Sequence, residues 1–83
     1  MKMRVYAVSN PAWQPVKNGQ PYNKWTATIQ LTNPHKILFG FRYYLVIADK
    51  DKEKVEKRLS DFLVGQIVSV PRNRLIMPQG VQK

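Results

Sequence analysis

Several residues and segments on which common functions depend are scarce or missing in this chain of 83 residues. It has no cysteine, which excludes disulfides and thiolate metal sites. Its single histidine, His35, lies in a proline-containing turn without a nearby carboxylate to orient it for acid–base chemistry. No apolar run approaches the ~18 residues of a membrane-spanning helix, and the first residues lack the apolar part of a signal peptide. We therefore expect a cytoplasmic protein that is not an enzyme and needs no metal or cofactor.

Acidic residues are also few, and they are confined to one segment. All five lie within residues 49–61 beside five basic residues, whereas the remainder of the chain holds nine Lys or Arg and no acid. The net charge of +9 is therefore carried outside this segment. A surface nearly free of carboxylates attracts polyanions, so the charge pattern favours a nucleic acid as the partner.

The chain is long enough for a single domain, residues 1–83, with one modest core. Apolar residues alternate with polar ones, or cluster between turn residues, in five segments that we expect to be strands: 1–8, 25–32, 36–47, 66–70 and 72–77. Between the first two strands, residues 9–24 contain three prolines and no apolar periodicity. This composition predicts a long loop or a wing-like hairpin, and loops of such length are usually functional.

The apolar period becomes helical after residue 48. It predicts a helix over residues 49–63, begun by Asp49 or Asp51, with one apolar stripe formed by Val55, Leu59, Phe62 and Leu63. The resulting order matches a mainly β fold, a five-stranded oligonucleotide-binding barrel with its helix between strands three and four. A small α+β fold is the alternative. The ribonucleoprotein-motif fold is disfavoured, because it needs a helix where residues 9–24 are rich in proline.

Residues 36–47 place aromatic side chains on both faces of one expected strand. Alternate residues point in opposite directions, so one face carries Phe39, Phe41, Tyr43, Leu45 and Ile47, and the other carries Leu38, Gly40, Arg42, Tyr44 and Val46. The first face is the more apolar, and we expect it in the core. The second combines Arg42 and Tyr44 with a glycine that exposes the backbone. That combination suits a phosphate contact beside a ring that stacks on a base.

Two tryptophans and two arginines complete the candidates. Trp25 lies on the apolar face of its expected strand and should pack in the core, whereas Trp13, between two prolines, either covers one end of the barrel or stacks on a base. Arg72 and Arg74 would share one face of the last strand. They would contact phosphates, protect an exposed strand edge, or do both.

Two blocks of sequence, "VKNGQPYNK" and "FLVGQIVSVPRNRL", resemble the gene five single-stranded DNA-binding proteins of filamentous phages. The first block matches that family's Gly-x-Pro-Tyr after a basic residue, and the second matches its Phe-x-Val-Gly-Gln-x-x-Ser followed by Arg-Leu. The matching positions are Lys17, Gly19, Pro21, Tyr22, Phe62, Val64, Gly65, Gln66, Ser69, Arg74 and Leu75. Together the blocks cover about a quarter of the chain.

The resemblance implies a five-stranded barrel, a homodimer, and sequence-tolerant, cooperative coating of single-stranded phage DNA. Tyr22 would be a stacking ring, and Lys17 and Arg74 would contact phosphates. The chain departs from the family at Gln20, where the family has a second base, and at Ile67, where it has an aromatic residue. A charged helix over residues 49–61 also replaces a loop of the family.

We therefore expect a protein of a phage or mobile element that binds single-stranded nucleic acid in the host cytoplasm, with DNA favoured over RNA. The candidate binding residues are Trp13, Lys17, Tyr22, Lys24, Arg42, Tyr44, Arg72 and Arg74. Two other classes stay open. One is a small basic ribonuclease toxin, and the other is a viral protein that binds a host protein complex.

Overall fold

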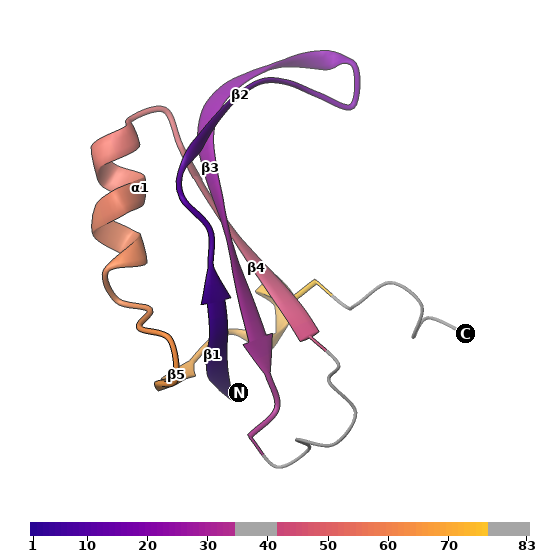
Figure 1. Cartoon of the computed structure of the whole chain (residues 1–83). Helices are drawn as coiled ribbons and strands as arrows, with labels where there is room; N and C mark the ends of the chain where they lie inside the picture. The colour runs from indigo at the N-terminus through magenta and orange to yellow at the C-terminus, as the bar shows by residue number, and fades with distance from the viewer. Residues whose placement is uncertain (35–41, 77–83) are drawn as a thin grey trace.

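The computed structural model describes residues 1–34 and 42–76 (Figure 1). The fold is mainly β, as expected, and the described residues form five antiparallel strands and one helix. The helix lies between the fourth and fifth strands rather than between the third and fourth, because an additional strand forms within residues 9–24. The elements in chain order are β1 (Lys2–Val8), β2 (Ala12–Lys17), β3 (Gln20–Thr32), β4 (Arg42–Asp49), α1 (Lys52–Leu59), β5 (Ile67–Ser69) and a short 3-10 helix, η1 (Arg72–Arg74).

The long strand β3 organises the sheet. Its first part pairs with β2, and its second part lies between β1 and β4, while β5 pairs with the other edge of β1. On the free edge of β4, Tyr44 exchanges backbone hydrogen bonds with Ile76, at 3.0 Å and 2.8 Å. The described residues thus curve toward a barrel, but hydrogen bonds do not close it between β5 and β4.

The core lies on one face of this sheet, where α1 covers it. Alternate residues of β1, β3 and β4 point inward, so the period-two pattern of the sequence becomes the buried side. The buried residues are Met3, Val5, Ala27, Ile29, Leu31, Leu45, Ile47, Val55 and Val70. Leu45 and Ile47 belong to the face of residues 36–47 that was expected inside, and Tyr43 packs against the core. Residues 36–41 of that segment lie outside the described residues.

The helix is shorter than the predicted 49–63. Asp51 begins it, because its Oδ1 accepts the backbone N–H of Glu53 at 3.1 Å and satisfies a donor of the first turn. It ends at Leu59, where the backbone N–H of Phe62 turns back to the Leu59 carbonyl at 2.9 Å. Phe62 still packs against the core, but Leu63 is 62% exposed and does not belong to the apolar stripe.

The predicted fifth strand over residues 72–77 is wrong for residues 72–75. After Pro71, the backbone N–H of Arg74 donates to the Pro71 carbonyl at 3.1 Å, and that of Leu75 donates to Arg72 at 3.2 Å. These i to i+3 bonds form a 3-10 turn, and of residues 72–76 only Ile76 pairs with β4. The fold has five strands because β2 forms within the segment where a loop or hairpin was expected.

Candidate nucleic-acid interface

Strands β2 and β3 form the wing-like hairpin, which bends away from the body (Figure 1). Lys17 pairs with Gln20, so Asn18 and Gly19 make a two-residue turn, with φ values of 54° and 78°. Two successive positive φ angles are typical of a type I′ turn, whose backbone twist matches that of the two paired strands. Asn-Gly is the dipeptide that adopts this turn most readily. Of the two alternatives for residues 9–24, the hairpin is therefore the correct one.

A bulge shapes the middle of the wing. Gln14 pairs with Lys24 and Val16 with Pro21, so Pro15 alone faces both Tyr22 and Asn23. Pro15 has no N–H to donate to the ladder, and Asn23 takes a left-handed backbone with φ of 52°. The bulge thereby changes the alternation of side chains along β3 at Tyr22 and Asn23.

The wing collects an aromatic ring and two ammonium groups. The Nζ atoms of Lys17 and Lys24 each lie 5.1 Å from the centre of the Tyr22 ring. We call Lys17, Tyr22 and Lys24 the wing cluster. Its members come from both strands of the hairpin, and the bulge and the turn bring them together. A ring flanked by cations offers a surface for stacking a base with phosphate-binding groups beside it.

Trp13 and Trp25 face each other at the base of the wing. They are paired across β2 and β3, with ring centres 5.7 Å apart in an edge-to-face arrangement of 62°. Trp25 packs against the core, as expected, and Lys52 Nζ lies 5.2 Å from its ring. Trp13 keeps 46% of its surface exposed. The tryptophan pair therefore lies at the junction of wing and body, on the core side of β3.

The face of the sheet opposite the core forms a second group, which we call the outer face. Arg42 and Tyr44 of β4 point to it, since Leu45 and Ile47 alternate with them toward the core. The Arg42 guanidinium carbon lies 4.0 Å from the centre of the Tyr6 ring, and Tyr6 is 50% exposed. Within the described part of the chain, Arg42 Nε is buried and has no hydrogen-bond partner.

Tyr6 is a residue that the sequence reasoning missed. The signal was available, because Met3 and Val5 alternate into the core and leave Lys2, Arg4 and Tyr6 on the other side of β1. What the sequence does not show is that Tyr6 reaches Arg42 across β3.

A row of polar residues on β3, which we call the strip, connects the wing with the outer face. It consists of Lys24, Thr26, Thr28, Gln30 and Thr32 at alternate positions, and Thr32 pairs with Arg42. From Lys24 to Thr32 the strand advances by eight steps of ~3.4 Å, which is about 27 Å. This is compatible with the ~4 to 16 nucleotides that one oligonucleotide-binding domain covers. The strip contains no acidic residue.

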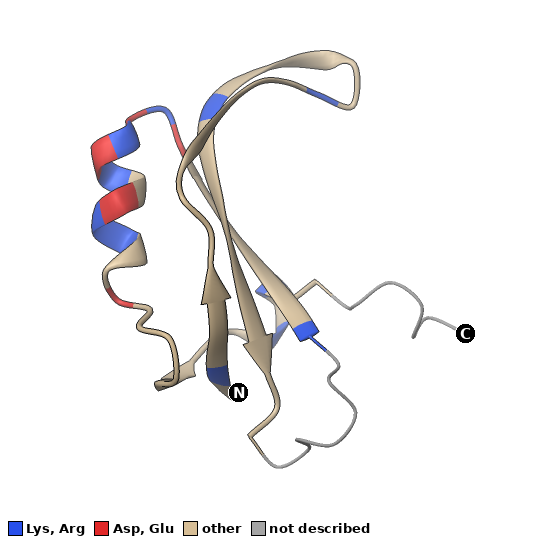
Figure 2. Cartoon of the chain, viewed as in Figure 1, with Lys and Arg blue, Asp and Glu red and all other residues tan. Residues whose placement is uncertain are grey.

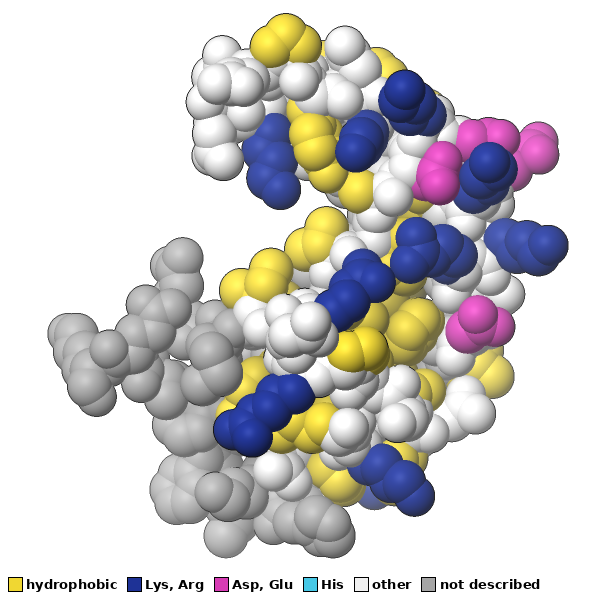
Figure 3. Space-filling view, turned by 180° about the vertical axis from the view of Figure 1, so that it is seen from behind, with side chains coloured by type: hydrophobic (Ala, Val, Ile, Leu, Met, Phe, Trp, Pro, Cys, Tyr) yellow, Lys and Arg dark blue, Asp and Glu magenta, His cyan; other side chains and the backbone are white. Residues whose placement is uncertain are grey.

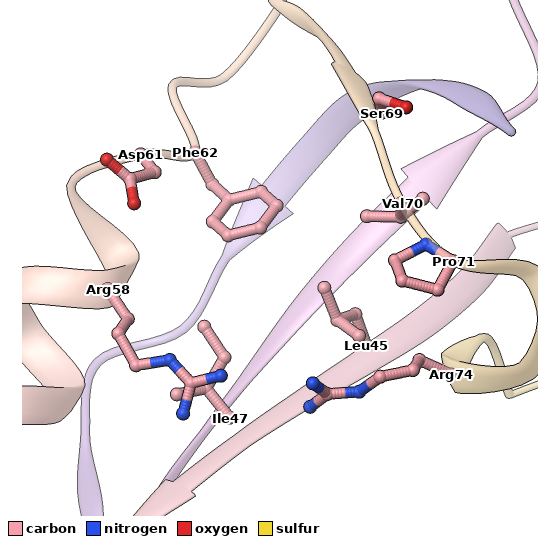
Figure 4. Close-up of a pocket in the computed structure, with 9 residues that line it drawn as sticks. All are labelled: Leu45, Ile47, Arg58, Asp61, Phe62, Ser69, Val70, Pro71 and Arg74. Atoms are coloured by element: carbon pink, nitrogen blue, oxygen red, sulfur yellow. The ribbon is translucent and has the colours of Figure 1, made fainter.

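Arg72 and Arg74 lie elsewhere, in η1, so the expectation that they share a strand face is wrong. Arg74 lines a pocket on the core side of β4 (Figure 4). The eight candidate residues therefore fall into four places: the wing cluster, the tryptophan pair, the outer face and η1. The structure joins the first and third through the strip on β3, and it separates Trp13 and the two arginines of η1 from them.

The charges are distributed as the sequence indicates. Acidic residues gather around α1, and Lys and Arg occur on the wing and at the opposite end of the sheet (Figure 2). From the opposite side, basic side chains follow one another from beneath the overhanging wing down over the body, while acidic ones stay at one edge (Figure 3). A polyanion can thus approach the wing without passing the carboxylates.

No family model, curated protein or solved structure matches this chain. The resemblance to the gene five proteins therefore stays a prediction from the two blocks of sequence. Among residues 1–34 and 42–76, no helix is long and apolar enough to cross a membrane.

Proposed function

We propose that this protein binds single-stranded nucleic acid with little sequence preference, through the wing cluster and the outer face. The observation that carries the proposal is the Tyr22 ring with two lysine ammonium groups 5.1 Å from its centre, on a projecting hairpin without any acidic residue. Tyr22 stacks on a base, and Lys17 and Lys24 contact the adjoining phosphates. Every base has a flat π-face, so such contacts tolerate any sequence.

The outer face extends this contact over the body. Arg42 offers a guanidinium to a phosphate, and Tyr44 and Tyr6 offer rings beside it. The Tyr6 ring already holds the Arg42 side chain at 4.0 Å, which limits the entropy lost when a phosphate binds. Duplex DNA keeps its bases stacked inside and cannot supply them to Tyr22, so single strands are preferred.

The two sequence blocks favour DNA over RNA and a role in coating phage or mobile-element DNA as a homodimer in the host cytoplasm. Light scattering with and without an oligonucleotide measures the oligomeric state.

The test is a titration with a thymidine oligomer of about twenty nucleotides, in which tryptophan fluorescence reports binding. The same titration with duplex DNA and matched RNA measures the preference. Tyr22→Ala should weaken single-strand binding by roughly 1–3 kcal/mol, about 5- to 150-fold, whereas Tyr22→Phe keeps the ring and should retain most of the affinity. Equal losses in both variants would contradict stacking, and absence of single-strand binding at low salt would refute the function. Fragmentation of labelled RNA would favour the ribonuclease alternative.

A further inference from the structure

A pocket of about 220 Å³ opens on the core side of β4, between the end of α1 and the segment that runs from β5 into η1 (Figure 4). Its apolar lining comes from Leu45 and Ile47 of β4, Val70 after β5, and Phe62 after the helix. Leu45, Ile47 and Val70 are at most 5% exposed, so they form a fixed floor that belongs to the core. The outer face lies on the other side of the same strand, and a nucleic acid bound there leaves this pocket free.

Two arginines from distant parts of the chain line this pocket. Arg58 comes from the last turn of α1 and Arg74 from η1, and their guanidinium groups face each other across the opening (Figure 4). Asp61 also lines the pocket. Within residues 1–34 and 42–76, however, no carboxylate forms an ion pair with either guanidinium, and neither guanidinium is hydrogen-bonded. The fold thus brings two positive charges together above apolar residues, and no described residue pairs with them.

The residues that line the pocket indicate which kind of ligand it can bind. Guanidinium groups bind phosphate and carboxylate through paired hydrogen bonds, and an apolar floor covers a ring or a short aliphatic body. The volume lies below the ~300 to 1,000 Å³ of sites that hold drug-sized molecules, so the body must be small. We propose that this pocket binds a small amphipathic anion, with one phosphate or carboxylate between Arg58 and Arg74 and a single apolar ring or short chain on Leu45, Ile47, Val70 and Phe62.

The test uses isotope-labelled full-length protein and follows chemical shifts of the pocket methyl groups by NMR. Benzyl phosphate and phenylpropanoate are the anionic probes, and benzyl alcohol and phenylpropanol are their neutral counterparts. Inorganic phosphate supplies the charge without the apolar body. We expect saturable shifts at Leu45, Ile47 and Val70 with at least one anionic probe, and binding at least about tenfold weaker for its neutral counterpart. The probe that binds better identifies the anionic group.

Arginine variants distinguish binding in this pocket from nonspecific attraction of anions to a basic protein. Arg58→Gln and Arg74→Gln should each weaken the better probe at least about tenfold, because each removes a charge-assisted hydrogen bond. Arg72→Gln removes the same charge from the same turn but does not line the pocket, and should change affinity by no more than about twofold. All three arginines are exposed, so the variants should fold, as the same spectra will show.

The proposal would be overturned by the absence of a saturable shift with either anionic probe, by equal affinity for a neutral counterpart, or by equal affinity for inorganic phosphate. An equal loss in Arg72→Gln would also overturn it. Thymidine-oligomer binding by Arg58→Gln gives an independent control, because the wing cluster and outer face do not include Arg58. Retained oligomer binding with lost probe binding would separate this site from the proposed function.

Discussion

Replacing Lys17 and Lys24 together by glutamine should change the salt dependence of single-strand binding by a predictable amount. The proposed interface offers three basic groups to phosphates: Lys17, Lys24 and Arg42. At about 0.7 per contact for single strands, log K should fall with log salt with a slope of about −2.1, and the double variant should show about −0.7. Between 50 and 200 mM salt, affinity should then fall about 18-fold for the parent protein and about 2.6-fold for the variant, by the same relation.

The assay is the thymidine-oligomer titration at several salt concentrations, with the slope rather than one affinity as the readout. Lys50→Gln with Lys54→Gln is the matched control, because it removes the same two charges from exposed positions around the acidic segment. Its slope should stay close to that of the parent protein. If both double variants make the salt dependence less steep by the same amount, net charge governs binding. The assignment of phosphate contacts to the wing is then refuted.

Three further predictions concern the elements that carry these sites. Gly19→Ala places a side chain at φ +78° and should destabilise the wing turn by about 1–2 kcal/mol, seen as faster amide exchange in β2. Asn18→Gly should cost little, and equal exchange in both variants would contradict the turn assignment. Val55→Ala empties a fully buried position and should lower the free energy of unfolding by roughly 1–3 kcal/mol in urea, whereas Lys54→Ala should stay within about 0.5 kcal/mol. Asp51→Ala should cost about 1 kcal/mol in the same assay, and no change there would argue against its role at the helix start.

The sequence predicted best the features that depend on alternation along single strands. In residues 27–31 of β3 and 45–47 of β4, buried apolar side chains occupy every second position, because each strand has one face against the core and one face outside. This alternation was enough to place Leu45 and Ile47 inside and Arg42 and Tyr44 outside. The helical stripe likewise predicted that Val55 is buried.

Turn geometry and contacts between strands that are not neighbours could not be predicted from this alternation. Whether residues 9–24 form a loop or a hairpin was left open, and the Asn18-Gly19 turn decides it. Residues 72–75 have the composition of a short strand, yet the i to i+3 bonds that follow Pro71 close a turn there instead. Contact between Tyr6 and Arg42 requires both β1 and β4 to pair with β3.

Strand β4 contributes residues to both of the binding sites proposed here, one on each face of the strand. Tyr44 and Arg42 point to the outer face. Leu45 and Ile47 point to the core and form the floor of the pocket that Arg58 and Arg74 line. A slip of one residue in the pairing of β4 with β3 would exchange these sets and destroy both sites at once. The register is held by the eight residue pairs of β3 and β4, from Trp25 with Asp49 to Thr32 with Arg42. Burial of Leu45 and Ile47 stabilises that register, and the same burial keeps Tyr44 and Arg42 available on the opposite face.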